Sequence, residues 1–195
     1  MSPKSFRELV GAPPSTATTK DSVLVIIDAQ GEYADGLLAV TNIASSRPAI
    51  ASLLEKYRAT GGAVAHVVHI TPEGAPVFTP KTALAEEFLE LRPTEGSTTE
   101  FVVPKQFPGC FAETTLRAQI DKTGLKKVVL TGYMAHVCVS TTAREADQLG
   151  YEVLVVEDAI GDRDIPGATG EEVTKMVLVE LGDVFVTVVK SGDIQ

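Results

Sequence analysis

A cysteine near the start of a predicted helix is the side chain in this sequence best suited to act as a nucleophile. Cys138 follows a β-rich run, residues 126–130, and a Thr-Gly pair, and it falls in the first turn of a helix-patterned segment. The first turn of a helix carries unpaired backbone N–H groups and a partial positive charge, which favour a thiolate over a thiol. A strand, a tight turn and a nucleophile at a helix start together present a side chain at the mouth of a parallel sheet.

Two charged residues follow other predicted strands. Asp28 ends an apolar strand, and Lys105 comes shortly after the strand expected over 101–103. Each has a plain alternative, since the aspartate could cap a turn and the lysine could be a solvated surface charge. Cys138 alone is also ambiguous, because a free cysteine is often a small buried hydrophobic residue. Open α/β sheets bind ligands at the carboxyl ends of their strands, so the three residues together indicate one catalytic site.

The composition indicates a soluble globular protein of one domain. A chain of 195 residues is long enough for one domain with a sizeable core. Its 44% hydrophobic and 22% charged residues are typical of a globular protein. The net charge of −9 argues against nucleic acid and anionic membranes as partners. No apolar run is long enough to cross a bilayer, and the N-terminus lacks the pattern of a secretory signal. Cys110 and Cys138 do not form a close pair, which favours free thiols and a cytoplasmic location.

Six β-like segments alternate with helical ones and predict an α/β fold. The expected strands are continuous runs of Val, Ile and Leu, as is typical where both faces of a sheet are covered. We therefore expect a Rossmann-like, three-layer α-β-α domain over 22–195 with a six-stranded parallel sheet, preceded by a loosely ordered N-terminal arm over 1–21. The expected strands are Val23–Asp28, Val64–His69, Phe101–Val103, Lys127–Leu130, Val153–Val156 and Val184–Val189, and the expected helices are Ala49–Tyr57, Glu113–Thr123, Val139–Leu149 and Glu171–Leu181, the last stopped by Gly182.

These motifs resemble those of the isochorismatase-like cysteine hydrolases, a family that includes nicotinamidases, carbamoyl-amide hydrolases and true isochorismatases. The resemblance runs from about residue 22 to the C-terminus. It rests on Asp28-x-Gln, on Lys105-Gln-Phe and on the Thr-Gly-x-x-x-x-x-Cys-Val-x-x-Thr block around Cys138. The resemblance implies a catalytic triad of these three residues. It also implies a non-proline cis peptide before the nucleophile, which would join Tyr133 to Met134.

The resemblance further implies a mechanism that these residue types support. Asp28 would take the thiol proton, and Lys105 with the helix N-terminus would stabilise the Cys138 thiolate. The thiolate would attack an amide-type carbonyl and form a thioester as the amine leaves, and water would then release the acid. The backbone N–H groups of Met134 and Cys138 would form the oxyanion hole. The expected reaction is the hydrolysis of a small amide-type (C–N) substrate, with no cofactor.

Two departures from the family pattern bear on the substrate. Nicotinamidases of the family bind a metal through histidines that follow the first strand, but no histidine lies between Asp28 and His66, so we expect no metal site. His66 and His69 would point to opposite faces of one strand, with one packed and one near the pocket rim. True isochorismatases convert isochorismate to 2,3-dihydroxy-2,3-dihydrobenzoate and pyruvate and usually have glycine at the position of Cys138. The cysteine therefore favours amide chemistry and leaves the vinyl ether as an alternative.

Other classes of protein fit the sequence less well. The glycine-rich fingerprint of dinucleotide-binding domains and the Gly-x-Ser-x-Gly of serine hydrolases are both missing. The alternative of a catalytically silent family member that serves as a binding or scaffold protein remains, although this sequence keeps all three triad residues. The expected partner is a small-molecule substrate, and relatives lead us to expect a homodimer or homotetramer. The substrate-binding candidates are those close in sequence to the triad: Gln30, Tyr33, Phe107, Tyr133, Met134 and His136.

Overall fold

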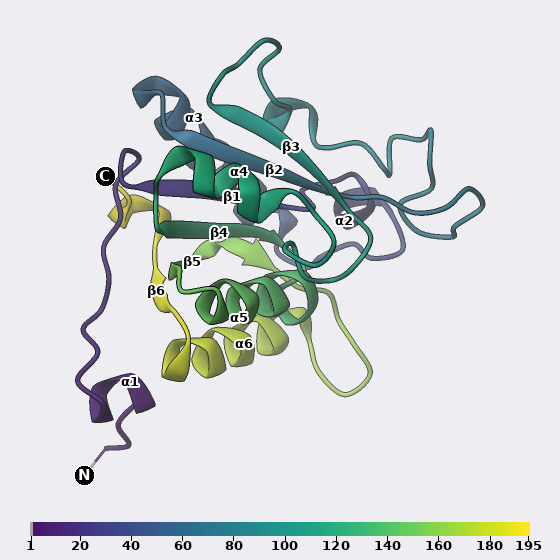
Figure 1. Cartoon of the computed structure of the whole chain (residues 1–195). Coiled ribbons are helices and arrows are strands. Elements are labelled where there is room, and N and C mark those ends of the chain that lie inside the picture. The colour runs from purple at the N-terminus through teal and green to yellow at the C-terminus, as the bar shows by residue number, and fades with distance from the viewer. Residues whose placement is uncertain (1) are drawn as a thin grey trace.

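The computed structural model describes residues 2–195 and contains one parallel sheet with helices on both faces (Figure 1). The strand order β3-β2-β1-β4-β5-β6 confirms the expected six-stranded α/β architecture. The order reverses between β1 and β4, and such a switch point is where open α/β sheets bind ligands. The strands are β1 (Ser22–Ile27), β2 (Ala63–His69), β3 (Glu100–Lys105), β4 (Lys127–Tyr133), β5 (Glu152–Gly161) and β6 (Thr187–Val189).

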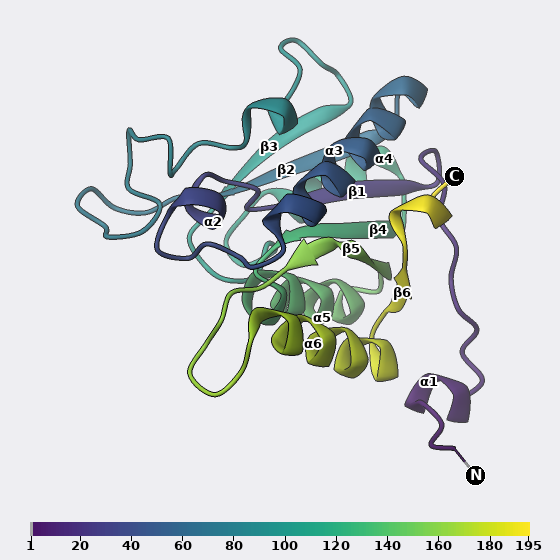
Figure 2. The same cartoon turned by 180° about the vertical axis from the view of Figure 1, so that it is seen from behind.

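The central strand β1 shows why its sequence is continuously apolar. All its residues are buried, and they alternate between two cores. Val23, Val25 and Ile27 pack with α4, α5 and α6 on one face. Leu24 and Ile26 pack with α3 on the other face, which Figure 2 brings to the front. The helices are α1 (Phe6–Leu9), α2 (Glu32–Asp35), α3 (Ile43–Thr60), α4 (Leu116–Thr123), α5 (Ser140–Gln148) and α6 (Gly170–Val184), with short turns η1 (Leu89–Leu91), η2 (Ala135–Val139, a π-helix) and η3 (Ser191–Asp193).

The last expected strand begins too early. Val184 is the final residue of α6, and only 187–189 form β6. Gly182 does not stop the helix but lies inside it. A side chain at Gly182 would crowd Val188 on the neighbouring strand, so the glycine permits close packing of helix against strand. The helix instead ends where the Leu181 carbonyl accepts hydrogen bonds from two later N–H groups.

Several other boundaries also differ from the expectation, including those of β3, which continues to Lys105, and β4, which continues to Tyr133. Helix α3 begins at Ile43 rather than at 49, with Pro48 inside it. Helix α4 begins at Leu116, because Glu113 has a positive φ of 54° that a helix does not accommodate. Strand β5 continues past Val156 to Gly161, and this extension matters for the active site.

The N-terminal arm has more structure than expected, since it contains the one-turn helix α1. Figures 1 and 2 both show α1 at a distance from the sheet, beside the end of α6. Closer to the domain, Ala17 is buried and the N–H of Thr19 donates to the carbonyl of Gln195. The boundary between arm and domain stays a prediction. No helix within residues 2–195 combines the length and apolar character needed to span a membrane.

Candidate active site

The structure brings Asp28, Lys105 and Cys138 together at the switch point of the sheet. The ammonium nitrogen of Lys105 lies 2.7 Å from Oδ2 of Asp28 and 3.4 Å from Sγ of Cys138. All three side chains are buried. Three residues from the ends of three segments, each ambiguous alone in the sequence, therefore form one contiguous cluster.

Asp28 follows the last residue of β1 in a left-handed conformation with φ of 49°, which is uncommon for a residue other than glycine. Such strained residues gather at functional sites because the surrounding structure has to enforce them. Its backbone N–H donates to the Val67 carbonyl at 2.8 Å. Apart from the ion pair of Oδ2 with Lys105, the carboxylate has no hydrogen-bond partner within residues 2–195. Oδ1 of Asp28 is therefore the oxygen available to accept or deliver a proton.

Lys105 is the last residue of the edge strand β3, and its ammonium group has several acceptors besides Asp28. It donates to the carbonyl of Phe107 at 3.1 Å and contacts Nδ1 of His69 at 3.4 Å. Burial is the largest single effect and lowers the pKa of Lys105, but the charge of Asp28 together with the neighbouring thiols and the hydrogen bond to Asp28 makes the net shift upward. The lysine is thus a fixed positive charge beside the sulfur.

The sulfur of Cys138 rests as a thiol. Burial, followed by the negative charge of Asp28, raises the pKa of Cys138 to about 12, and Lys105 offsets only part of this effect. The start of a helix was expected to favour the thiolate instead. Burial acts against that expectation, because desolvation favours the neutral thiol. Burial also raises the pKa of Asp28, which makes it a stronger base than an ordinary aspartate.

Gly132 explains the Thr-Gly pair that precedes the nucleophile. Its φ is 105°, and a side chain at this position would collide with the carbonyl of Ile27 on β1. Only glycine lets β4 pass this close to the end of β1. The expected cis peptide between Tyr133 and Met134 is confirmed.

Two of the substrate-binding candidates use their polar groups within the protein. The Gln30 amide nitrogen donates to the carbonyls of His69 and Ala85, and its oxygen accepts the N–H of His69. The Tyr133 hydroxyl lies 2.8 Å from Oγ of Ser46. Both side chains are fully buried. These contacts favour a role in shaping the site, and direct binding of substrate by either residue stays a prediction.

Three further candidates, Tyr33, Met134 and Phe107, differ in their exposure. Tyr33 is buried, and burial, followed by the negative charge of Asp28, raises its pKa. Met134 is buried in the nucleophile turn, and the exposed ring of Phe107 lies at the protein surface. The roles of these side chains in binding, and of the Met134 and Cys138 N–H groups as an oxyanion hole, stay predictions.

The two histidines of β2 separate as expected. His66 is fully buried between carboxylates, 3.0 Å from Glu87 and 3.2 Å from Glu100. His69 is half-buried, and burial followed by the charge of Lys105 lowers its pKa. It is therefore neutral at pH 7 and able to accept a hydrogen bond from Lys105. The expectation of one packed and one peripheral histidine is confirmed.

Sequence reasoning missed Asp162. This buried residue follows β5, and its Oδ2 accepts the backbone N–H of His136 at 2.8 Å. The same rule that identified Asp28, a carboxylate at a strand end, would have found it. The rule failed because β5 was expected to end at Val156, six residues earlier.

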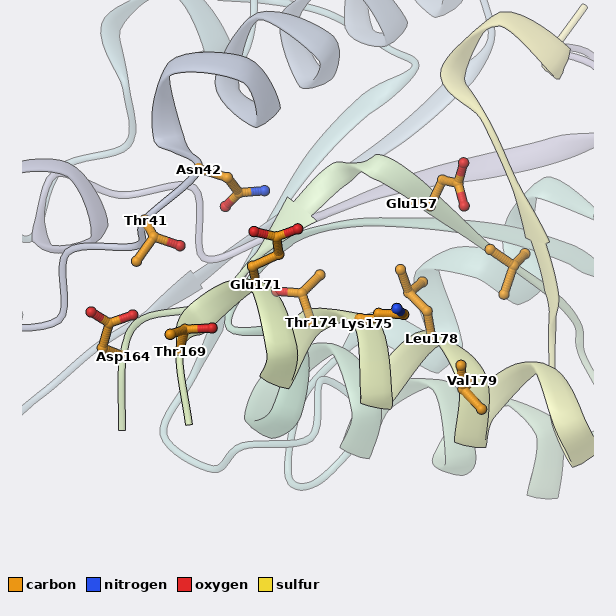
Figure 3. Close-up of a pocket in the computed structure, with 11 residues that line it drawn as sticks. Thr41, Asn42, Glu157, Asp164, Thr169, Glu171, Thr174, Lys175, Leu178 and Val179 are labelled. Carbon is orange, nitrogen blue, oxygen red and sulfur yellow. The ribbon is translucent and has the colours of Figure 1, made fainter. Parts of the chain in front are cut away.

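Two cavities differ in their relation to the cluster. One of about 600 Å³ adjoins it through His69 and is also lined by Thr71, Phe78, Lys81, Glu87 and Arg92. A second, of about 740 Å³, lies between α6, β6 and the Thr41–Asn42 segment (Figure 3). Neither cavity is lined by Asp28, Lys105 or Cys138, but only the first includes His69, which contacts Lys105. The first cavity is therefore the candidate route to the site.

Comparison with known proteins identifies the family. The isochorismatase domain model matches residues 22–191, and the chain belongs to this family of hydrolases. It is 60% identical to the secreted isochorismatase effector Isc1 of Verticillium dahliae, over 97% of this chain and 98% of that protein. It is 35% identical to a streptothricin hydrolase of Streptomyces noursei, over 74% of this chain and 51% of that protein. The crystal structure of an isochorismatase from Pseudomonas putida KT2440 matches 100% of both chains with a TM-score of 0.93 and 30% identity.

The expectation of a cytoplasmic location is wrong. The Verticillium relative, 60% identical over 97% of this chain, is a secreted effector. The expectation relied partly on the absence of a cysteine pair. Cys110 and Cys138 are both buried, so packing shields them from oxidants and their free state carries no information about the compartment.

Proposed function

We propose that this protein is a secreted hydrolase that cleaves isochorismate, with Asp28 and Lys105 as the reacting pair beside the thiol of Cys138. The observation that carries the proposal is the 60% identity, over nearly the full length of both chains, to a secreted isochorismatase effector. The cluster supplies what the reaction needs. It has a carboxyl group that exchanges protons and a fixed cation, both buried at the switch point of the sheet.

The reaction is the acid-catalysed hydrolysis of a vinyl ether. A proton adds to the terminal carbon of the enolpyruvyl group, water adds to the resulting oxocarbenium carbon, and the hemiketal then breaks its bond to the ring oxygen. The products are pyruvate and 2,3-dihydroxy-2,3-dihydrobenzoate, and one water is consumed. Asp28 is the proton donor, because burial raises its pKa and increases the protonated fraction. Lys105 attracts the anionic substrate and limits charge build-up in the buried site.

The cavity beside His69 supports this choice of substrate. Isochorismate carries two carboxylates, and the cavity lining includes the cationic side chains of Lys81 and Arg92. Both are also close to acidic residues, Lys81 to Glu73 and Arg92 to Glu86. A dianionic substrate would compete with these exposed pairs, which are individually weak.

A second candidate is the hydrolysis of a small amide, favoured by the position of the sulfur. Cys138 lies 3.4 Å from Lys105, which is itself 2.7 Å from Asp28. In this route Asp28 takes the thiol proton, and the thiolate attacks the amide carbonyl. The tetrahedral intermediate expels the amine, which receives the proton from Asp28. Water activated by Asp28 then cleaves the thioester and restores the thiol. The relative named streptothricin hydrolase shows that the family includes hydrolases named for other substrates.

The two routes assign different importance to the sulfur, so paired variants separate them. We would measure pyruvate release from isochorismate and amine release from a panel of small amides. Asp28→Asn should lower kcat/KM for either substrate by about 10²–10⁴-fold. Cys138→Ala should abolish amide hydrolysis but keep most of the pyruvate release. Cys110→Ala serves as the control, because it removes a buried thiol that takes no step in either route.

The outcomes decide between the proposals. Pyruvate release by the wild type that persists in Cys138→Ala supports the isochorismate route. The absence of pyruvate release from isochorismate would overturn it. Turnover of amides alone, lost in Cys138→Ala, would establish the second candidate. A folded wild type that acts on neither class would instead favour a catalytically silent binding protein.

A further inference from the structure

The three clustered side chains are closed off from solvent. The most accessible of them, Cys138, is only 5% exposed, and Asp28 and Lys105 are buried more deeply. None of the three lines the cavity of about 600 Å³ beside His69. A molecule that reacts at the cluster therefore has to pass a barrier between this cavity and the three side chains. The residues that form this barrier decide which molecules are admitted.

Phe78 and His69 form the barrier. Both line the cavity, and the centroids of their rings lie 5.0 Å apart. His69 also contacts the ammonium of Lys105 at 3.4 Å. The Phe78 ring packs edge-on against the buried ring of Tyr33, with the two centroids 5.3 Å apart. A molecule that moves from the cavity toward Lys105 thus meets the ring of Phe78.

The backbone at Phe78 is strained. Its φ is 48°, which makes a bulky residue a genuine outlier. Strained residues persist only where the surrounding structure enforces them, and they gather at ligand clamps and switch regions. Two side chains enforce the strain here. The N–H of Phe78 donates to Oε2 of Glu32 at 2.9 Å, and its carbonyl accepts the hydroxyl of Thr71 at 2.9 Å.

Glu32 is a fully buried carboxylate that joins two loops to α2. Besides the N–H of Phe78, it accepts the N–H of Leu38 through Oε1 at 3.2 Å. A buried carboxylate is unfavourable unless it is hydrogen-bonded, and hydrogen bonds to an ionised acceptor are stronger than neutral ones. Phe78 lies in the connection between β2 and β3, residues 70–99, which projects beyond the end of β2 in Figure 1. The carboxylate therefore fastens part of a long loop against α2.

We propose that Phe78 determines which molecules reach the reaction centre, and that Glu32 is the residue that positions it. In the closed arrangement the Phe78 ring covers the passage beside His69. When the hydrogen bond to Glu32 is released, residue 78 leaves its left-handed conformation, and the relief of strain offsets part of the lost bond. The ring then moves away from His69 and admits small molecules more readily than large ones. The proposal rests on the proposed function only in taking the cluster as the reaction centre, and it applies to an ether and to an amide substrate.

The rate of alkylation of Cys138 measures access without turnover. We would compare iodoacetamide with the much larger N-(1-pyrenyl)maleimide and identify the modified peptide by mass spectrometry. Phe78→Ala should raise the rate with the maleimide by at least about tenfold and the rate with iodoacetamide by less than about threefold, because the missing ring limits the larger reagent more. Glu32→Ala should also favour the maleimide. Glu32→Gln should have a smaller effect than Glu32→Ala, because it keeps one acceptor oxygen.

Phe88→Ala is the matched control for the loss of a buried ring. Phe88 lies in the same connection and is 5% exposed, against 4% for Phe78, but its ring packs against Tyr133. It should leave both alkylation rates within about twofold of the wild type. Phe78→Leu keeps part of the apolar volume without the ring, and it replaces Phe78→Ala if circular dichroism shows that variant to be unfolded. It should favour the maleimide in the same way.

Glu73→Gln is the matched control for Glu32→Gln. Glu73 belongs to the same loop, but it is exposed and pairs with the exposed Lys81. An exposed pair of this kind contributes little to stability. The variant should therefore leave both alkylation rates unchanged. An effect as large as that of Glu32→Gln would show that any lost charge in the loop opens the site, and it would overturn the role given to Glu32.

The pH dependence separates access from ionisation. Phe78→Ala should raise the logarithm of the rate by the same amount at every pH from about 7 to about 10, because it leaves the thiol pKa in place. Unchanged rates in Phe78→Ala, an increase equal for the two reagents, or an equal increase in Phe88→Ala would each overturn the proposal. The labelling needs no substrate. A failure of the proposed reaction therefore leaves this test valid, and a failure of this test leaves the proposed reaction standing.

Discussion

Asp162, at the end of β5, forms hydrogen bonds to His136, which lies in the turn after β4. These bonds hold the turn that carries the nucleophile. Its Oδ2 accepts the backbone N–H of His136 at 2.8 Å and lies 2.7 Å from Nδ1 of the same residue. Its Oδ1 accepts the N–H of Arg163. His136 lies two residues before Cys138, in the π-helix η2. A buried carboxylate at the end of β5 therefore fixes the position of the sulfur supplied from the end of β4.

We expect Asp162→Ala to lower kcat about tenfold or more and to change KM by less than about threefold. The variant loses both hydrogen bonds to His136, so the turn moves relative to Asp28 and Lys105, while the cavity that admits substrate stays intact. Asp162→Asn should keep part of the rate, because its amide oxygen still accepts the backbone N–H. Steady-state kinetics on the substrate identified above measures both effects.

Asp158→Asn is the matched control for this prediction. Asp158 is an aspartate within β5 whose oxygens accept a backbone N–H and a hydroxyl, both from Ser191, which lies in η3 and not in the nucleophile turn. It should leave kcat unchanged. A change in KM alone for Asp162→Ala, with kcat preserved, would show that Asp162 does not position the sulfur.

Gly132→Ala should destabilise the fold by more than about 2 kcal/mol. The added carbon meets the Ile27 carbonyl and also has to adopt a φ of 105°. Gly150→Ala separates the two effects, because Gly150 has a φ of 82° but open space around it. It should cost about 1 kcal/mol. Urea denaturation of both variants measures the difference, and equal losses would contradict a role for close packing at Gly132.

The sequence allowed the sheet and the reaction centre to be predicted because both depend on strong local signals. Buried strands such as β1 have to be apolar on both faces, and polar residues at their ends, such as Asp28, then stand out. Strand β5 was harder, because its second half includes Glu157 and Asp158 and reads as a loop. The polarity is possible there because β6 is too short to cover that edge. Asp162 was missed for this reason.

The ionisation state of the sulfur could not be predicted from the sequence either. A cysteine at a helix start suggests a thiolate, whereas depth of burial and the charge of Asp28 decide the outcome here. Both depend on residues that are distant in the chain. The same holds for Gln30 and Tyr133, whose positions suggested contact with substrate but whose polar groups are bonded within the protein. Proximity in sequence identified the neighbourhood of the site but did not assign the role of each side chain.

Iodoacetamide should alkylate Cys138 slowly at pH 7.5. A pKa of about 12 in place of the ordinary 9.0 lowers the thiolate fraction roughly a thousandfold. The rate should rise with pH throughout the range from 7 to 10. Asp28→Asn should accelerate the reaction, because it removes the negative charge that raises the pKa, and Lys105→Met should slow it. Mass spectrometry of the peptide that contains Cys138 distinguishes it from Cys110. Fast alkylation of the wild type at pH 7, unaffected by Asp28→Asn, would contradict a resting thiol.

The free energy of unfolding should fall as the pH drops from about 4.5 to about 2, in part because of Glu100. Burial raises the pKa of Glu100, but hydrogen bonds from Arg58 and Thr94 outweigh it and lower the pKa to about 2. The unfolded chain, with an ordinary value of 4.5, binds a proton in this range that the folded protein does not. Stability from this group is therefore complete above pH 4.5 and is lost below it, by on the order of 1–3 kcal/mol.

Glu100→Gln isolates this contribution. The variant should be less stable than the wild type at pH 6, because Arg58 loses a buried partner at 3.1 Å, and it should lose less stability on acidification. Urea denaturation between pH 6 and pH 2.5 gives both slopes. His66 and Glu87 belong to the same buried network. Burial raises the pKa of Glu87, so Glu87 takes up its proton above pH 4.5. It therefore does not add to the loss of stability that Glu100 causes below pH 4.5. Parallel slopes for the wild type and Glu100→Gln would show that the Arg58–Glu100 pair does not set the acid sensitivity of the fold.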